Sequence, residues 1–159
     1  MSIQEDLKIA LISQVIEQVS GEKPITVKYR GNKVAMIFRK NLKVNHVQFF
    51  TDIHNPFQIG IHERPKNVKL PPHVHLIEKK LTIDTIQELL FVQSGKIKVS
   101  LITSRGEKIR DIILTGGDSI LLMSEGHGVE FIEKSRIFEV KQGPYPGTTH
   151  AKIYLNEKH

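Results

Sequence analysis

The chain has 159 residues, the size of one domain, and it contains no cysteine, which excludes disulfides and thiolate metal sites. Its formal net charge is +6, but the basic residues are dispersed and only 6% of residues are aromatic, so we expect no nucleic-acid partner. No apolar run is long enough to span a membrane, and charges interrupt the N-terminal residues too often for a signal peptide. We therefore expect a cytoplasmic protein that does not interact with membranes.

The chain begins with a predicted helix and continues as predicted strands. Apolar residues recur at three- and four-residue steps between residues 7 and 19, and Gly21 follows them. We expect this segment, 1–22, to pack on the β-barrel that the later strands are predicted to form, or on a partner subunit. The expected strands are 25–29, 34–39, 46–50, 57–62, 73–77, 88–93, 96–102, 109–114, 119–123, 128–132, 136–141 and 152–155. Many short strands without helices between them predict an all-β sandwich or barrel over residues 23–159.

Four side chains in this β region have the chemistry of a metal site. His73 and His75, in "PPHVH", are two residues apart, so on a strand both imidazoles point to the same face. Glu88 shares a strand face with apolar residues, where a carboxylate is costly unless it is paired or bound to metal. His127 lies between two glycines at a tight turn. Three imidazoles and one carboxylate suit a first-row divalent metal with open coordination positions.

The stretches "PPHVH", "ELLFVQSGKIKV" and "GDSILLMSEGHG" resemble the two motifs of the cupin superfamily, G-x5-H-x-H-x3,4-E-x6-G and G-x5-P-x-G-x2-H-x3-N. The matching residues are His73, His75, Glu88 and Gly95 in the first motif, and Gly117 and His127 in the second. The resemblance covers residues 57–141. It implies a double-stranded β-helix, the cupin jelly-roll barrel. It also implies that the two histidines, the glutamate and the third histidine bind one divalent first-row transition metal, Fe, Mn, Ni or Zn.

The sequence departs from these motifs at several positions. Asn67 stands where the first motif has glycine, and asparagine tolerates left-handed backbone conformations. Twelve residues separate His75 from Glu88, where the family has three or four, and they predict a longer excursion at the barrel mouth. In the second motif Met123 replaces proline, and no asparagine follows His127.

Three further residues are candidates for binding a substrate. His62 alternates with Gly60 on the strand before the histidine pair, and from there it could line the pocket. Glu139 and Lys141 share one face of a strand that is otherwise rich in apolar residues. If that face points inward, these two side chains would bind or orient a polar ligand, whereas outward they form a solvated face.

The chain is most similar to small single-domain cupins of surface-polysaccharide and sugar-nucleotide pathways. This similarity leads us to expect a homodimer with a metal-binding, small-molecule pocket for a sugar or organic acid, the ligand being anionic. Such a protein would be a metal-dependent isomerase or oxygenase. Two alternatives stay open. One is a metal-free nucleotide-sugar isomerase or epimerase that uses a barrel histidine as base, and the other is a non-catalytic binding or regulatory module.

Overall fold

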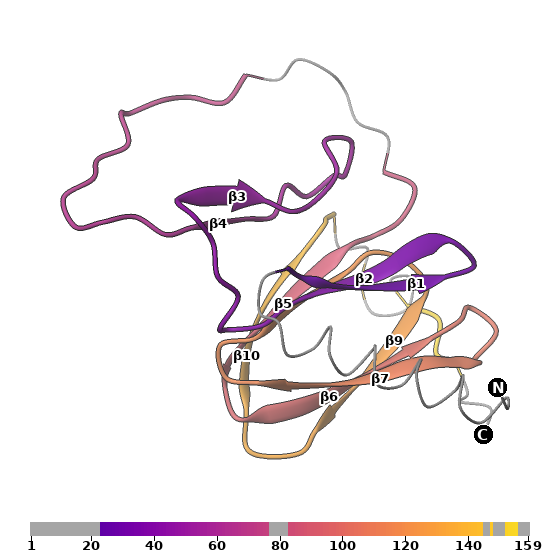
Figure 1. The fold of residues 1–159 in the computed structure, drawn as a ribbon. Helices are drawn as coiled ribbons and strands as arrows, with labels where there is room; N and C mark the ends of the chain where they lie inside the picture. Colours follow the sequence, from indigo (N-terminus) through magenta and orange to yellow (C-terminus); the bar gives the residue numbers. More distant parts are fainter. Residues whose placement is uncertain (1–22, 77–82, 145–146, 148–151, 156–159) are drawn as a thin grey trace, which may run out of the picture.

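A computed structural model of the chain describes residues 23–76, 83–144, 147 and 152–155 (Figure 1). These residues form antiparallel β-strands and contain no helix. The strands are β1 (Ile25–Tyr29), β2 (Asn32–Phe38), β3 (Val47–Phe49), β4 (Gly60–His62), β5 (Glu88–Ser94), β6 (Lys96–Ile102), β7 (Lys108–Thr115), β8 (Ser119–Leu122), β9 (Gly126–Phe131) and β10 (Arg136–Lys141). The all-β prediction is therefore confirmed for the described part of the chain.

The strands are arranged in three sheets. The largest has five strands in the order β1-β2-β8-β5-β10, and a second has the order β7-β6-β9. The third sheet is the short β3-β4 pair. Consecutive strands β5 and β6 lie in different sheets, as do β7 and β8, so the chain crosses between the two larger sheets repeatedly.

The main core lies between the inner faces of the two larger sheets. Alternate residues of β5, Leu90 and Val92, are buried there, and so are Ile97, Val99 and Leu101 of β6. Because side chains alternate between the two faces of a strand, this spacing places one whole face of each strand in the core.

A second apolar cluster covers the outer face of the five-stranded sheet. Met36 and Phe38 of β2 and Leu121 of β8 are buried there under Leu42 and partly buried Phe50. The segment that connects β2 to β4 therefore packs on this face. It carries the β3-β4 pair away from the main core (Figure 1).

Two turns are fixed by specific residues. Gly95, between β5 and β6, has a φ of 84°, and a Cβ there would clash with the main-chain oxygen of Lys134, so only glycine fits. Before β8, the buried Asp118 carboxylate accepts bonds from Arg39 Nη1 at 3.0 Å, the Lys40 main-chain N–H at 3.0 Å and the Thr115 main-chain N–H at 2.9 Å. Asp118 thereby ties the β7-β8 turn to the end of β2.

Four expectations differ from this structure or lie outside it. The predicted strand 73–77 is wrong for its described residues 73–76, and residues 152–155 also form no strand. Neither segment has a strand beside it among the described residues, and an isolated strand leaves its main-chain groups unpaired. The predicted helix, 7–19, lies outside the described residues. The two larger sheets do not close into a barrel in the described part of the chain, where β9 and β10 are edge strands.

Candidate functional site

Strand pairing places a carboxylate and an amine together at one end of the five-stranded sheet. Glu88 is the first residue of β5, and its register partners are Leu122 in β8 and Lys141 in β10. Lys141 is the last residue of β10, so both polar side chains lie at the end of their strands, next to the apolar core. The Lys141 Nζ lies 3.4 Å from Glu88 Oε1 and 3.2 Å from Glu139 Oε1.

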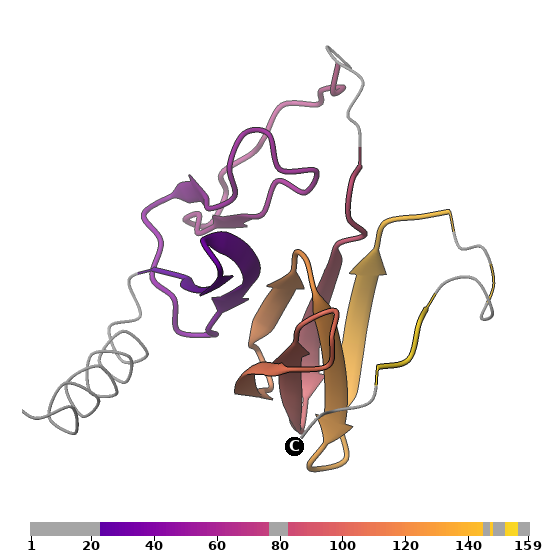
Figure 2. The ribbon, with the colours of Figure 1, turned by 90° about the vertical axis from the view of Figure 1, so that its right-hand side faces the viewer.

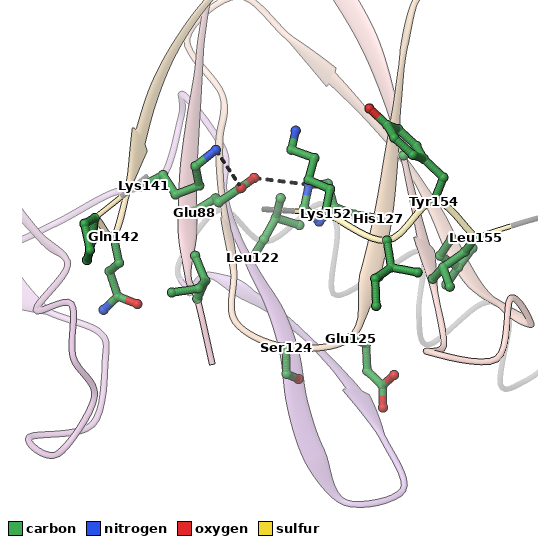
Figure 3. Close-up of a pocket in the computed structure, with 16 residues that line it drawn as sticks. Glu88, Leu122, Ser124, Glu125, His127, Lys141, Gln142, Lys152, Tyr154 and Leu155 are labelled. Atoms are coloured by element: carbon green, nitrogen blue, oxygen red, sulfur yellow. Dashed lines mark ion pairs between the residues drawn. The ribbon is translucent and has the colours of Figure 1, made fainter. Parts of the chain in front are cut away.

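His127 reaches the same carboxylate from the other sheet. It is the second residue of β9, and its Nε2 lies 3.1 Å from Glu88 Oε2. Figure 3 shows Lys141 and His127 approaching Glu88 from opposite sides. Only 12% of the Glu88 side chain is exposed. The three residues therefore form a partly buried cluster that bridges the two larger sheets.

The electrostatics of the cluster favour a charged Glu88. The hydrogen bond from His127 lowers the pKa of the Glu88 carboxyl, and the positive charges of His127 and Lys141 act in the same direction, against the effect of burial. The pKa of Lys141 is raised, first by its hydrogen bond to Glu139 and then by the charge of Glu88. Around neutral pH, Glu88 is thus an anion held between two nitrogen donors.

The cluster opens onto a cavity of about 650 Å³. Its apolar walls come from Ile86, Ile102, Leu122, Ile153 and Leu155. Its other polar lining residues are Ser124, Glu125, Gln142, Lys152 and Tyr154. A cavity of this size with mostly apolar walls and a few polar groups at one place is typical of a small-molecule site.

The C-terminal segment 152–155 forms one wall of this cavity. It packs closely on the start of β9, because a Cβ at Gly126 would lie 2.9 Å from Leu155 Cδ1 and 3.0 Å from Ile102 Cγ1. Glycine at position 126 therefore allows the close approach of this wall, which also brings Lys152 and Tyr154 to the cavity (Figure 3).

The structure brings together Glu88 and His127, but His73 and His75 lie elsewhere. All residues from 62 to 76 are exposed, and the two histidines are in the long segment that leaves the sheets after β4 (Figures 1 and 2). Their rings contact each other edge to face at 5.0 Å, and His73 Nδ1 lies 2.9 Å from the Pro71 carbonyl oxygen. Asn67, in the same segment, has a φ of 71°, the left-handed conformation that asparagine tolerates.

A metal ion does not fit the positions that these four side chains occupy. Within the described ranges, no group of three or more His, Asp or Glu residues is close enough to hold one. Glu88 and His127 supply two ligands, and the oxygens of Glu88 already contact His127 and Lys141. The four-ligand metal site therefore stays a prediction.

The three residues predicted to bind substrate are in different places. Lys141 lines the cavity, as expected for an inward-facing side chain. Glu139 does not line it, and contacts it only indirectly through its ion pair with Lys141. His62 is exposed on β4, where its ring packs edge to face on Phe49 at 6.2 Å.

Sequence reasoning did not single out most of the residues that complete the cavity. Gln142 follows Lys141 directly, and its proximity to the site could be inferred only from the pairing of β10 with β5. Lys152 and Tyr154 lie in segment 152–155, which forms no strand and whose four residues all line the cavity. Nothing in the local sequence indicates that this segment would meet β9.

The described residues define an all-β domain with a polar cluster at the entrance to an apolar cavity. Comparisons of the chain with protein-family models, curated proteins and solved structures found no match. Among the described residues, no helix has the length and apolar character required to cross a membrane.

Proposed function

We propose that the cavity binds a small polar molecule, such as a sugar or an organic acid, and that His127 and Glu88 exchange a proton with it. The observation that carries this proposal is the contact of His127 Nε2 with Glu88 Oε2, at 3.1 Å, on the wall of a cavity of about 650 Å³. A histidine oriented by a carboxylate is a common arrangement for a general base. The reaction class is isomerisation or epimerisation next to a carbonyl.

The roles follow from the hydrogen-bonding capacity of each group. When His127 is neutral and donates its Nε2–H to Glu88, its other nitrogen, Nδ1, is the basic one. Nδ1 would take a proton from the carbon next to the ligand's carbonyl group and then return it to a carbon or oxygen of the same ligand. Glu88 would stabilise the imidazolium formed in between, while Lys141 keeps Glu88 ionised.

We also propose that the two larger sheets belong to a cupin barrel. In support, the motif residues lie at strand ends and in turns: Glu88 opens β5, Gly95 lies in the turn between β5 and β6 with φ 84°, and His127 is near the start of β9. Gly117, at the start of the second motif, has φ 94° in the turn before β8. The homodimer and the cytoplasmic location are part of the same proposal, and light scattering of the purified protein tests the first.

The proposed activity is tested in two stages. A thermal-shift screen with nucleotide sugars, free sugars and small organic acids identifies compounds that stabilise the protein. NMR in D₂O then follows deuterium uptake next to the carbonyl group of each stabilising compound. We expect uptake with the wild type, loss of uptake with His127→Ala, and normal uptake with His54→Ala, an exposed histidine outside the cavity. Persistent uptake in His127→Ala, or a screen without any stabilising compound, would refute the proposal.

The metal-dependent interpretation is tested on the same protein. It requires His73 and His75 to act with Glu88 and His127, and the rings of the first two contact each other edge to face at 5.0 Å. Metal content is measured after incubation with Fe, Mn, Ni and Zn salts and removal of free ions. About one equivalent of metal, lost in a His73→Ala/His75→Ala variant, would replace the metal-free mechanism with a metal-dependent one.

A further inference from the structure

A network of side-chain amides lies directly behind the Glu88–Lys141 pair. Gln87, which is buried, precedes Glu88, and Gln142 follows Lys141. The main-chain N–H of Gln142 donates to the Gln87 carbonyl oxygen at 3.3 Å, which extends the β5-β10 ladder by one step. The main-chain N–H of Gln87 donates to the side-chain Oε1 of Gln142 at 3.0 Å. A side-chain oxygen thus takes the place of a main-chain acceptor at the end of this ladder.

The side chain of Gln87 is fixed in turn by Asn55, in the β3-β4 connection. Asn55 Nδ2 donates to Gln87 Oε1 at 3.0 Å, and Gln87 Nε2 donates to Asn55 Oδ1 at 3.1 Å. Asn55 Nδ2 also donates to the Phe57 carbonyl oxygen at 2.7 Å. The two amides therefore satisfy each other reciprocally, and each can adopt only one of its two flipped orientations.

These contacts join three separate parts of the chain at the wall of the cavity. Asn55 belongs to the segment that covers the outer face of the five-stranded sheet, whereas Gln87 and Gln142 belong to β5 and β10 extensions. The cupin-like motifs do not specify this network, because Gln87 stands at an unspecified position of the first motif and Asn55 and Gln142 lie outside both motifs. Ordering these polar side chains costs free energy, and apolar side chains would fill the same space. The network therefore requires an explanation beyond core packing.

We propose that Asn55, Gln87 and Gln142 are positioning residues, which hold Glu88 and Lys141 at the distances that the cavity cluster requires. Without the Asn55–Gln87 amide pair, the last step of the β5-β10 ladder is held only by its bonds of 3.3 Å and 3.0 Å between Gln87 and Gln142, and the ends of both strands are free to fray. The Glu88 carboxylate would then move relative to His127 Nε2 and Lys141 Nζ. This inference rests on the proposed role of Glu88, but it is tested without any ligand.

The same geometry gives Gln142 a defined orientation. Because its Oε1 accepts the Gln87 N–H, its Nε2 is the atom that remains for other partners, and the side chain borders the cavity (Figure 3). The wall beside Lys141 therefore presents an amide donor. Such a donor suits an acceptor oxygen on a bound molecule.

The test is the carbon-13 NMR signal of the Glu88 carboxyl in full-length protein, recorded for all variants at one pH near neutrality. The variants are Asn55→Ala, Gln87→Ala and the double variant, and the control is Thr51→Ala. The control removes a hydrogen bond to the Ile59 main-chain N–H in the same covering segment without touching the amide network. The groups that surround Glu88 in all variants are His127, Lys141 and, through Lys141, Glu139.

We expect the Glu88 carboxyl signal to shift or broaden in both single variants, because the carboxylate is no longer held in one place against His127 Nε2 and Lys141 Nζ. The double variant should show no larger change than either single variant, since both substitutions break the same contact. An unchanged signal in both single variants would overturn the proposal, and so would an equal change in Thr51→Ala. If Gln87→Ala does not fold, Gln142→Ala removes the Oε1 acceptor from the cavity wall and gives the same test.

Discussion

The residues predicted to form one site lie in two regions that differ in how the chain is held. Glu88 and His127 are on β5 and β9, whose partners in the sheets fix their register. His73 and His75 are in segment 63–76, which has no strand and is exposed throughout. In the sequence, the pattern "PPHVH" is as clear as the pattern around Glu88. A sequence pattern therefore fixes the direction of side chains only where a neighbouring strand pairs with the segment that carries it.

The largest expected effect compares how much each of the two regions contributes to the proposed reaction. His127→Ala removes the proposed base, and we expect deuterium uptake by a cavity ligand to fall by about 10²–10⁴-fold, the usual contribution of general base catalysis. NMR time courses at equal protein concentration measure the difference. A similar fall in His73→Ala/His75→Ala would show that segment 63–76 takes part in the reaction and would remove the distinction drawn above.

The next effect compares how much side-chain packing in each region contributes to the free energy of unfolding. Leu101 on β6 is fully buried, whereas 82% of Val74 is exposed. We expect Leu101→Ala to lower the free energy of unfolding by about 3 kcal/mol, because it leaves a cavity in the core. Val74→Ala should change it by less than about 0.5 kcal/mol. Urea unfolding measures both values, and a large loss for Val74→Ala would mean that this segment is packed in solution.

A smaller effect concerns the turn between β7 and β8, directly before the strand β8 that pairs with β5. Asp118→Ala removes the acceptor of Arg39, of the Lys40 main-chain N–H and of the Thr115 main-chain N–H. We expect a loss of about 2 kcal/mol, because three donors lose their charged partner, the buried Asp118 carboxylate. Asp84→Ala, at an exposed position before β5, is the matched control and should be nearly neutral. Equal urea midpoints for the two variants would contradict this account of the turn.

The smallest effect is a pH dependence of stability. The pKa of Glu88 is lowered in the folded protein by His127 and Lys141, so its unfolded value is the higher of the two. The resulting stabilisation is present above the unfolded pKa and is lost as the pH falls through the folded pKa.

We therefore expect Glu88→Gln to be less stable than wild type at pH 7 by about 1 kcal/mol, the net value of one hydrogen bond. At pH 3 this difference should shrink. The control is Glu63→Gln, in the exposed segment, whose difference from wild type should not change with pH in this way. Urea unfolding at both pH values measures the effect, and a constant difference for Glu88→Gln would show that the carboxylate is not stabilised by its partners.

Much of the fold could be predicted because it depends on local alternation. The strands around Leu90, Val99 and Ile120 were predicted within a few residues. Buried and exposed positions alternate with a period of two around Leu90, whereas the strand around Ile120 is apolar on both faces. The inward direction of Glu88 followed from the same period. The pairing of Glu88 with His127 was expected through a metal, whereas the structure shows a direct hydrogen bond.

The remaining features could not be predicted because they depend on contacts between distant parts of the chain. Lys141 was a candidate on the evidence of its strand face alone, and its contact with Glu88 required the β5-β10 register. The Asn55–Gln87 amide pair joins residues 32 positions apart, and neither belongs to a recognisable motif. The exposed position of His73 and His75 depends on the absence of a partner strand, which their own sequence does not reveal.

By itself, the sequence determined that this protein is built from short strands, which faces of those strands are apolar, and which polar residues interrupt them. These properties are local, because side-chain direction along a strand alternates whatever the neighbours are. The tertiary structure decided which strands became neighbours, and so it placed Lys141 and His127 on either side of Glu88 at the wall of one cavity. That choice is non-local, because it depends on the burial of all strand faces together in a common core.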